Sequence, residues 1–226
     1  MYGPARLHKE RGPFVFEGGT MSKAPEVAAV VFDVGKVLYQ WRLAALIEKL
    51  TDDRAEQDHI LAEVITEEWH FQHDAGRPLA DMLPERIAQF PHAERFLRAY
   101  AERFNETLPG PVEGSLEIVR ELAAAAVPLF AITNFGAEFW AAFRPTAPIF
   151  DLFRDIVVSG EEKLVKPDPA IFALAADRFG HSPGAMLFID DNAANIAAAR
   201  ASGWHVHHFM DAAALRADLV TRGLLA

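Results

Sequence analysis

Cysteine is absent from the 226-residue sequence, which excludes disulfide frameworks, thiolate zinc sites and cysteine nucleophiles. Long hydrophobic runs are also missing: the longest, residues 122–132, contains Pro128 and is far shorter than the ~20 residues that a membrane-spanning helix needs. Basic residues are in the minority, since 32 acidic and 22 basic residues give a net charge of −10. Nucleic-acid and anionic-membrane partners require basic surfaces, so we expect neither.

Hydrophobic residues make up 51% of the chain, which is enough for a buried core and excludes a disordered protein. The length predicts one domain, or one domain with an insertion. Residues 1–26 differ from the rest, because glycine, proline and basic residues gather there without the apolar core of a secretory signal. We expect either a start codon upstream of the true start at Met21 or a mobile N-terminal arm, and a cytoplasmic protein.

From residue 27 onward, apolar runs alternate with helical periodicity. The runs have the composition of parallel strands buried on both faces, and they span residues 27–32, 127–132, 155–158, 185–189 and 204–206. The helical stretches span residues 111–125, 136–144, 167–178, 191–201 and 211–221. Pro111 and Pro167 are expected in first turns, where proline is favoured. Strand alternating with helix predicts an α/β fold with a parallel sheet.

Residues 41–108 interrupt this alternation and show no strand pattern. Between Ala93 and Phe104 apolar residues recur every three or four positions, which is one face of a helix. Residues 53–73 are also helical in pattern. The sequence therefore predicts a helical insertion over residues 41–108, with residues 27–40 and 109–226 forming the α/β core.

Polar side chains follow four of the predicted strands. Ligands of parallel α/β sheets bind outside the carboxyl ends of the strands, so we expect these side chains on one rim. Three carboxylates that lie close together repel one another and need a cation. Oxygen-only ligands select a hard ion, and Mg²⁺ is the common partner of phosphate substrates. The rim residues are Asp33, Thr133 with Asn134, Lys166, and Asp190 with Asp191.

The segments that carry these residues resemble the four ordered motifs of the haloacid dehalogenase-like hydrolase superfamily. They are Phe-Asp-Val-Gly-Lys-Val-Leu at 32–38, Ile-Thr-Asn at 132–134, Lys-Pro-Asp-Pro at 166–169 and Phe-Ile-Asp-Asp-Asn at 188–192. The resemblance covers nearly the whole chain from residue 27. It implies a Rossmann-like core, and residues 41–108 look like the helical cap of that family.

The resemblance also implies roles for the rim residues. Asp33 would be a carboxylate nucleophile, and Lys166 would stabilise the developing charge. Thr133, Asn134 and Lys166 would bind the phosphate. Mg²⁺ would be held by Asp33, Asp190, Asp191 and the main-chain carbonyl of Gly35, with Asn195 beneath that site.

One position departs from the pattern of phosphatases in this superfamily. They usually carry a second aspartate two residues after the nucleophile as general acid and base, and here that residue is Gly35. Dehalogenases of the superfamily also lack this aspartate, but they need no metal and do not keep the acidic pair. Some phosphatases, including ones acting on sugar phosphates, have Asp-x-Gly.

We therefore expect a Mg²⁺-dependent phosphatase acting on a small phosphomonoester, such as a sugar phosphate, through an aspartyl-phosphate. A 2-haloacid dehalogenase and a non-catalytic phosphate- or metabolite-binding protein are the alternatives. Either a monomer or a homodimer is compatible with the sequence.

Some histidine and basic residues leave two interpretations open. His73 and Arg77 either contact a leaving group or merely end a helix. His205 and His207 lie on the same face of one predicted strand. They are either metal ligands or surface residues between side chains that pack in the sheet. Lys36 either adds positive charge at the mouth of the pocket or points to solvent.

Overall fold

The computed structural model describes residues 27–226, so the arm expected over residues 1–26 lies outside the described residues. Five strands form one sheet in the order β3-β2-β1-β4-β5, and every neighbouring pair is parallel. The strands are β1 (Ala29–Phe32), β2 (Leu129–Thr133), β3 (Asp155–Val158), β4 (Met186–Asp190) and β5 (His205–His208). The predicted α/β fold with a parallel sheet is confirmed, and each strand lies within two residues of its predicted range.

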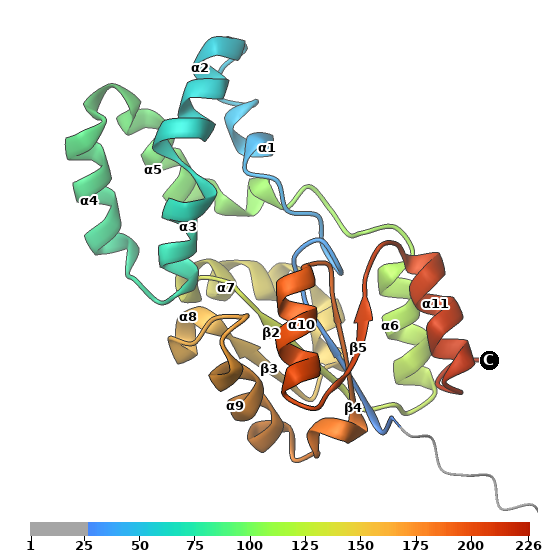
Figure 1. Cartoon of the computed structure of the whole chain (residues 1–226). Helices are drawn as coiled ribbons and strands as arrows, with labels where there is room; N and C mark the ends of the chain where they lie inside the picture. The colour runs from blue at the N-terminus through green and yellow to red at the C-terminus, as the bar shows by residue number, and fades with distance from the viewer. Residues whose placement is uncertain (1–26) are drawn as a thin grey trace, which may run out of the picture.

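Helices cover both faces of the sheet because side chains alternate along each buried strand. Val30 and Phe32 pack with one set of helices, whereas Ala29 and Val31 pack with the other. The first set includes α6 (Ser115–Ala124) and α11 (Ala212–Thr221), and the second is α9 (Pro169–Phe179) and α10 (Ala193–Ala201) (Figure 1). Among residues 27–226, no helix has both the length and the apolar character that crossing a membrane requires.

Two predicted helix starts are wrong. Pro111 lies ahead of α6 in a bridge to Tyr39, and the helix begins only after Gly114 turns the chain with a φ of +78°. Pro167 precedes α9, whose first residue is Pro169. The Asp168 side chain accepts a hydrogen bond from the Ala170 N–H at 2.9 Å. This cap satisfies a backbone donor that would otherwise be unpaired, and it sets the start of the helix.

A second layer of helices lies beyond the carboxyl ends of the strands (Figure 1). We call this layer, residues 44–107, the cap. It contains α1 (Ala44–Ile47), α2 (Arg54–His59), the π-helix η1 (Ile60–Val64), α3 (Glu67–Asp74), α4 (Leu79–Gln89), η2 (Pro91–Ala93), α5 (Glu94–Arg103) and η3 (Phe104–Thr107). The helical pattern predicted over residues 53–73 is interrupted at Thr66, whose hydroxyl caps α3. The domain boundaries at residues 40 and 109 stay a prediction.

The remaining elements connect the strands or lead into helices. They are α7 (Ala137–Phe143), η4 (Arg144–Thr146), η5 (Pro148–Leu152), α8 (Ser159–Glu162) and η6 (Pro183–Ala185).

The end of α3 is docked on the loops that follow β2 and β3. The Ser159 hydroxyl donates to the Asp74 carbonyl at 2.6 Å and accepts from the Phe135 N–H at 2.9 Å. Next to this bridge, a Cβ on Gly136 would lie 2.1 Å from the ring of His73. Only glycine lets the two segments approach this closely, so the docking of the cap depends on the lack of a side chain at residue 136.

Substituting Gly136→Ala tests this contact. We expect the free energy of unfolding to fall by about 1–3 kcal/mol, because the methyl group displaces the buried His73 ring. Gly184→Ala is the matched control, since its Cβ would be 3.9 Å from the nearest carbonyl oxygen. Urea unfolding of both variants measures the difference, and equal stabilities would show that the His73 ring moves aside without cost.

Candidate active site

A lysine ammonium lies between two carboxylates at the carboxyl edge of the sheet. Lys166 Nζ is 2.8 Å from Asp33 Oδ1 and 2.7 Å from Asp190 Oδ2. Asp33 directly follows β1 and Asp190 ends β4, so the two neighbouring strands bring the carboxylates together. All three side chains are buried. The predicted rim is therefore a cluster of charges held at hydrogen-bond distance and shielded from solvent.

Asp190 is surrounded by donors. Its carboxylate accepts from the Asn192 N–H at 2.7 Å, from Asn195 Nδ2 at 3.0 and 3.1 Å, and from Lys166. Asn195 was expected beneath the acidic pair, and the structure places its amide on Asp190. Both oxygens of Asp190 therefore accept hydrogen bonds, and its predicted role as a metal ligand stays a prediction.

Asn134 and Thr133 were both predicted to bind phosphate. The Asn134 side chain donates to the Lys166 carbonyl and accepts from the Lys166 N–H, both at 2.9 Å, so it fixes the backbone that carries the lysine. It also lines the pocket described below. Thr133 ends β2 beside this cluster, is buried, and does not line the pocket. The roles of the rim residues stay predictions.

The charges of this cluster do not balance. Two carboxylates contact the ammonium of Lys166 and a third, Asp191, lies beside them, so the carboxylates outnumber the buried cation. Burial raises the pKa of Asp33 to about 7, although the Lys166 charge opposes this shift. Burial also raises the pKa of Asp191, and the charge of Asp190 adds to the shift. For Lys166, burial would lower the pKa, but Asp190 and Asp33 raise it above its usual value, so the lysine stays charged.

The donor set fits a hard divalent cation. Oxygens of Asp33, Asp190 and Asp191 lie within 4.8 Å of one another. Within the described residues, the hydrogen bonds of Asp33 end on Oδ1, from Val34 N–H and Lys166, and Oδ2 remains for a ligand. Asp191 is half-buried, and Gly35 lines the same pocket. A divalent cation would neutralise the excess charge, and oxygen ligands suit Mg²⁺.

A pocket of about 350 Å³ opens between this rim and the cap. The rim contributes Asp33, Asn134, Lys166 and Asp191. The cap side combines polar with aromatic and aliphatic side chains, namely His70, Asp74, Trp41, Phe71, Phe104 and Leu108. From the sequence, His70 and Asp74 belong to a polar cluster at this helix end, but the substrate contact was predicted for His73 or Arg77 instead. His70 and Asp74 are four residues apart on one helix, and that spacing was the available signal.

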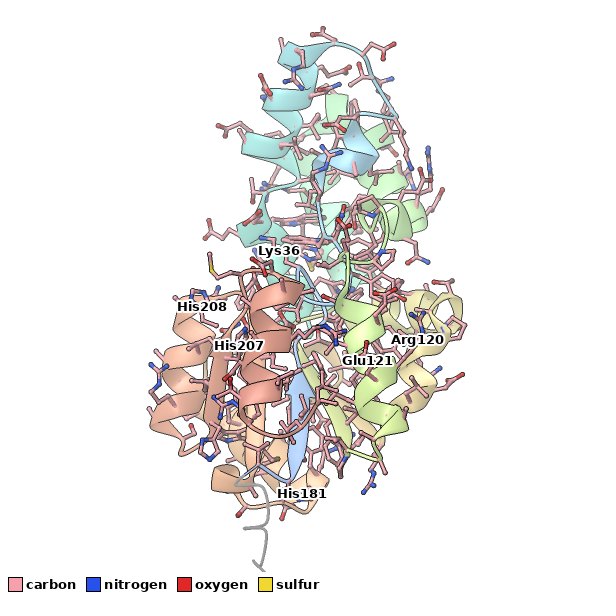
Figure 2. The ribbon with its side chains drawn as sticks, turned by 90° about the vertical axis from the view of Figure 1, so that its right-hand side faces the viewer. Lys36, Arg120, Glu121, His181, His207 and His208 are labelled. Carbon is pink, nitrogen blue, oxygen red and sulfur yellow. The ribbon has the colours of Figure 1, made fainter. Side chains whose placement is uncertain are left out.

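His73 and Arg77 do not line the pocket. His73 Nδ1 lies 2.8 Å from the Arg77 carbonyl at the end of α3, and the Arg77 guanidinium pairs with Glu85. Their interpretation as helix-end residues is therefore supported. Lys36 does line the pocket, with its Nζ 5.4 Å from the ring centroid of Trp41. Figure 2 shows Lys36 at the level where the cap meets the sheet.

The histidines of β5 do not form a metal cluster. His207 Nδ1 pairs with Asp218 Oδ2 at 2.9 Å, and His208 Nε2 lies 2.9 Å from the Asp191 carbonyl. Figure 2 shows both on the core, with His208 nearer to the cap than His207. Within residues 27–226, the cluster that meets the geometry of a metal site is the acidic one, without histidine.

Comparisons with known proteins identify the family. The model of the haloacid dehalogenase-like hydrolase family matches residues 27–203. Sesquiterpene phosphatase astK of Aspergillus oryzae is 25% identical, over 84% of this chain and 94% of that protein. Phosphoglycolate phosphatase of Pseudomonas putida is 31% identical over 48% of this chain, and the matched part spans only 39% of that enzyme.

Solved structures show the same fold. A predicted HAD-like family hydrolase from Porphyromonas gingivalis superposes with a TM-score of 0.68 at 19% identity, over 88% of this chain and 98% of that one. A HAD family enzyme from Bacteroides thetaiotaomicron, in complex with magnesium and inorganic phosphate, superposes with a TM-score of 0.63 at 19% identity, over 82% and 95%.

The buried ion cluster should make the free energy of unfolding depend on Lys166. Lys166→Met should lower the free energy of unfolding at pH 7 by about 3–5 kcal/mol, because it leaves buried carboxylates without a counter-charge. The variant's carboxylates will have raised folded pKa values, so its stability should fall as the pH rises and the deficit should be smaller at pH 5. Urea unfolding at both pH values measures this.

Lys49→Met is the matched control, because Lys49 forms an exposed ion pair with Glu106 that contributes at most about 1 kcal/mol. Adding Asp190→Asn to Lys166→Met should restore part of the loss. A pH-independent deficit in Lys166→Met would mean that lost packing, and not unpaired charge, causes it.

Proposed function

Since the chain belongs to the haloacid dehalogenase-like hydrolase family, we propose that it is a Mg²⁺-dependent phosphatase that hydrolyses a small phosphomonoester through an aspartyl-phosphate. Its relatives are phosphatases, so at the coarser level it is a phosphatase-like hydrolase. The observation that carries the proposal is Lys166 held between Asp33 and Asp190, with the carboxylate of Asp191 beside them. In this cluster the carboxylate of Asp33, the proposed nucleophile, contacts the ammonium of Lys166. A further positive charge is needed because the carboxylates outnumber the ammonium.

Each rim residue has a chemical task in this proposal. An oxygen of Asp33 attacks phosphorus, and Lys166 neutralises charge on the nucleophile and on the phosphoryl oxygens. Asn134 at the pocket, Thr133 buried behind it and nearby backbone N–H groups hold the phosphoryl group. Asp33, Asp191 and the carbonyl of Gly35 would hold Mg²⁺, which when bound supplies charge neutralisation to the phosphate.

Asp190 acts on the reaction through Lys166 and not by contact with the substrate, because its oxygens accept hydrogen bonds from Lys166, Asn192 and Asn195. It keeps Lys166 charged and aimed at Asp33. The dehalogenase alternative is disfavoured by the same cluster, because an anionic haloacid would meet the surplus carboxylates without the divalent cation that offsets them for a phosphate ester.

The cap side of the pocket suggests the kind of organic group that the substrate carries. Trp41 stacks on His70 with ring centroids 5.1 Å apart, and Phe71 is 41% exposed at the pocket. Phe104 and Leu108 extend this apolar wall. We propose a phosphate ester whose organic group has apolar surface, in preference to a polyhydroxylated sugar. The similarity to a sesquiterpene phosphatase over most of both chains supports this choice.

The first test is an assay with 4-nitrophenyl phosphate, with and without Mg²⁺, beside 2-chloropropionate. We expect turnover of the phosphate ester that is lost with a chelator, and no halide release. Asp33→Asn should lower turnover to background, because an amide cannot attack phosphorus. Asp191→Asn should raise the Mg²⁺ concentration needed for half-maximal activity.

Asp177→Asn, an exposed substitution on α9, is the control and should behave as the wild type. Metal-independent release of halide would support the dehalogenase alternative in place of the phosphatase.

The second test concerns the substrate. The kcat/KM for geranyl phosphate should exceed that for glucose 6-phosphate, and Trp41→Ala should reduce this ratio by about 10–200-fold, the range that pocket contacts with apolar groups contribute. Leu152→Ala, an exposed apolar substitution in η5 outside the pocket, should leave the ratio unchanged. A wild-type preference for glucose 6-phosphate would contradict the apolar assignment.

A further inference from the structure

The space beside the nucleophile at residue 35 is empty of side chains. A Cβ built on Gly35 would meet no atom within 4 Å. Gly35 has no proton to give, yet an alkoxide leaving group must be protonated as it departs. If the proposed phosphatase function holds, another group that lines the pocket has to supply the proton.

Asp74 lines this pocket from the cap, at the last residue of α3. It is only 6% exposed, and its Oδ1 has no hydrogen-bond partner within the described residues. Its backbone is fixed to the core, because its carbonyl accepts the Ser159 hydroxyl at 2.6 Å. A buried carboxyl oxygen without a partner is costly, so its retention in a pocket wall points to a ligand atom as its partner.

The neighbours of Asp74 favour its protonated form. Burial raises the pKa of Asp74 to about 8, while the Gly136 N–H lowers it, the Asp33 charge raises it and the Lys166 charge lowers it. Burial also lowers the pKa of His70 to about 3, so the imidazole is neutral and does not hold Asp74 ionised. At neutral pH the carboxyl therefore carries a proton to donate.

The polar contacts from Tyr100 through His70 to Asp74 indicate which oxygen carries that proton. The Tyr100 hydroxyl lies 2.6 Å from His70 Nδ1, and His70 Nε2 lies 3.3 Å from Asp74 Oδ2. Burial raises the pKa of Tyr100 well above its ordinary value, so the phenol keeps its hydrogen and can donate it to Nδ1. In that tautomer Nε2 carries the imidazole hydrogen and presents it to Oδ2, 3.3 Å away. The acidic proton then belongs on Oδ1, the oxygen without a partner.

We propose that Asp74 is the general acid and base of the reaction, supplied by the cap in place of the carboxyl missing at residue 35. In the first step an Asp33 oxygen bonds to phosphorus, the bond from phosphorus to the ester oxygen breaks, and the Asp74 proton passes to that oxygen, which leaves as an alcohol. In the second step the Asp74 carboxylate takes a proton from water as the water oxygen bonds to phosphorus. The bond to Asp33 breaks, phosphate is released, and both residues return to their starting states.

Other pocket residues are less suited to this task. His70 is neutral with both ring nitrogens facing Tyr100 and Asp74, so it is a positioning residue. Glu67 also lines the pocket, but it is exposed in the first turn of α3, seven residues before Asp74. Lys36 contributes charge at the mouth of the pocket.

The test is a series of phosphate esters from 4-nitrophenyl phosphate to n-butyl phosphate, measured with the wild type and Asp74→Asn. For the butyl ester, kcat/KM should fall by about 10²–10⁴-fold, because a poor leaving group needs protonation. For the nitrophenyl ester, kcat/KM should change far less, while kcat falls and a burst of nitrophenol appears, since the base for the second step is missing. Glu68→Gln, an exposed carboxylate on the same helix outside the pocket, is the control.

An equal loss of kcat/KM for both esters would assign Asp74 a structural role and overturn the proposal, leaving the phosphatase function intact. Wild-type protein that hydrolyses none of the esters with Mg²⁺ would instead overturn the proposed function, and the role of Asp74 with it.

A second measurement needs neither substrate nor metal. The folded protein keeps the Asp74 proton near pH 7, whereas the unfolded chain releases it, so this residue lowers stability as the pH rises from 5 to 8. The stability of the wild type relative to Asp74→Asn should therefore decline over that range. His70, Tyr100, Asp33 and Lys166 act on Asp74 and are present in both proteins. A difference that does not depend on pH would mean an ionised carboxylate and would overturn the proposal.

Discussion

The buried ammonium of Lys166 is the constraint on which the rest of the site depends. A lysine that is 2% exposed loses its proton unless anions surround it, and here Asp33 and Asp190 lie at 2.8 and 2.7 Å. The neighbouring strands β1 and β4 fix the separation of those two carboxylates. Asn134 and Asn195 then bind the backbone of the lysine and the carboxylate of Asp190. The apolar sheet keeps water out, so each of these interactions is stronger than it would be on the surface.

Much of the core could be predicted from the sequence, because a parallel sheet gathers the residues at its strand ends. The five strands and the rim residues follow from apolar runs and the polar residue after each run. The different positions of the two adjacent aspartates, Asp190 and Asp191, could not be predicted. Asp190 and Asp191 are adjacent in sequence, but Asp190 still belongs to β4 and faces inward to Lys166, whereas Asp191 follows the strand end and lies at the pocket. The difference of one residue reverses the direction of a side chain in extended backbone.

The cap could be predicted as helical but not in its orientation. The periodicity of α3 marks one face, and only docking against the core decides which residues of that face meet the pocket. His73 packs against Gly136, so it belongs to the contact between the layers, while Asp74 and His70 line the pocket. The signals for that docking are the glycine at residue 136 and the serine at residue 159. These residues lie far from α3 in the sequence, and one sequence alone does not reveal that they contact that helix.

If the cap carries the acid, proton transfer depends on the docking of the cap on the core. With a carboxyl at residue 35, the proton donor would belong to the same rigid sheet edge as Asp33 and would be in place whether or not the cap is docked. With Asp74 in that task, proton transfer requires the contacts that hold α3 to the core, namely the Ser159 bridge and the close approach at Gly136. Departure of a poor leaving group, and attack of water on the aspartyl-phosphate, would then both require α3 to be docked on the core. The same docked cap would therefore both exclude bulk water from the pocket and supply the catalytic group.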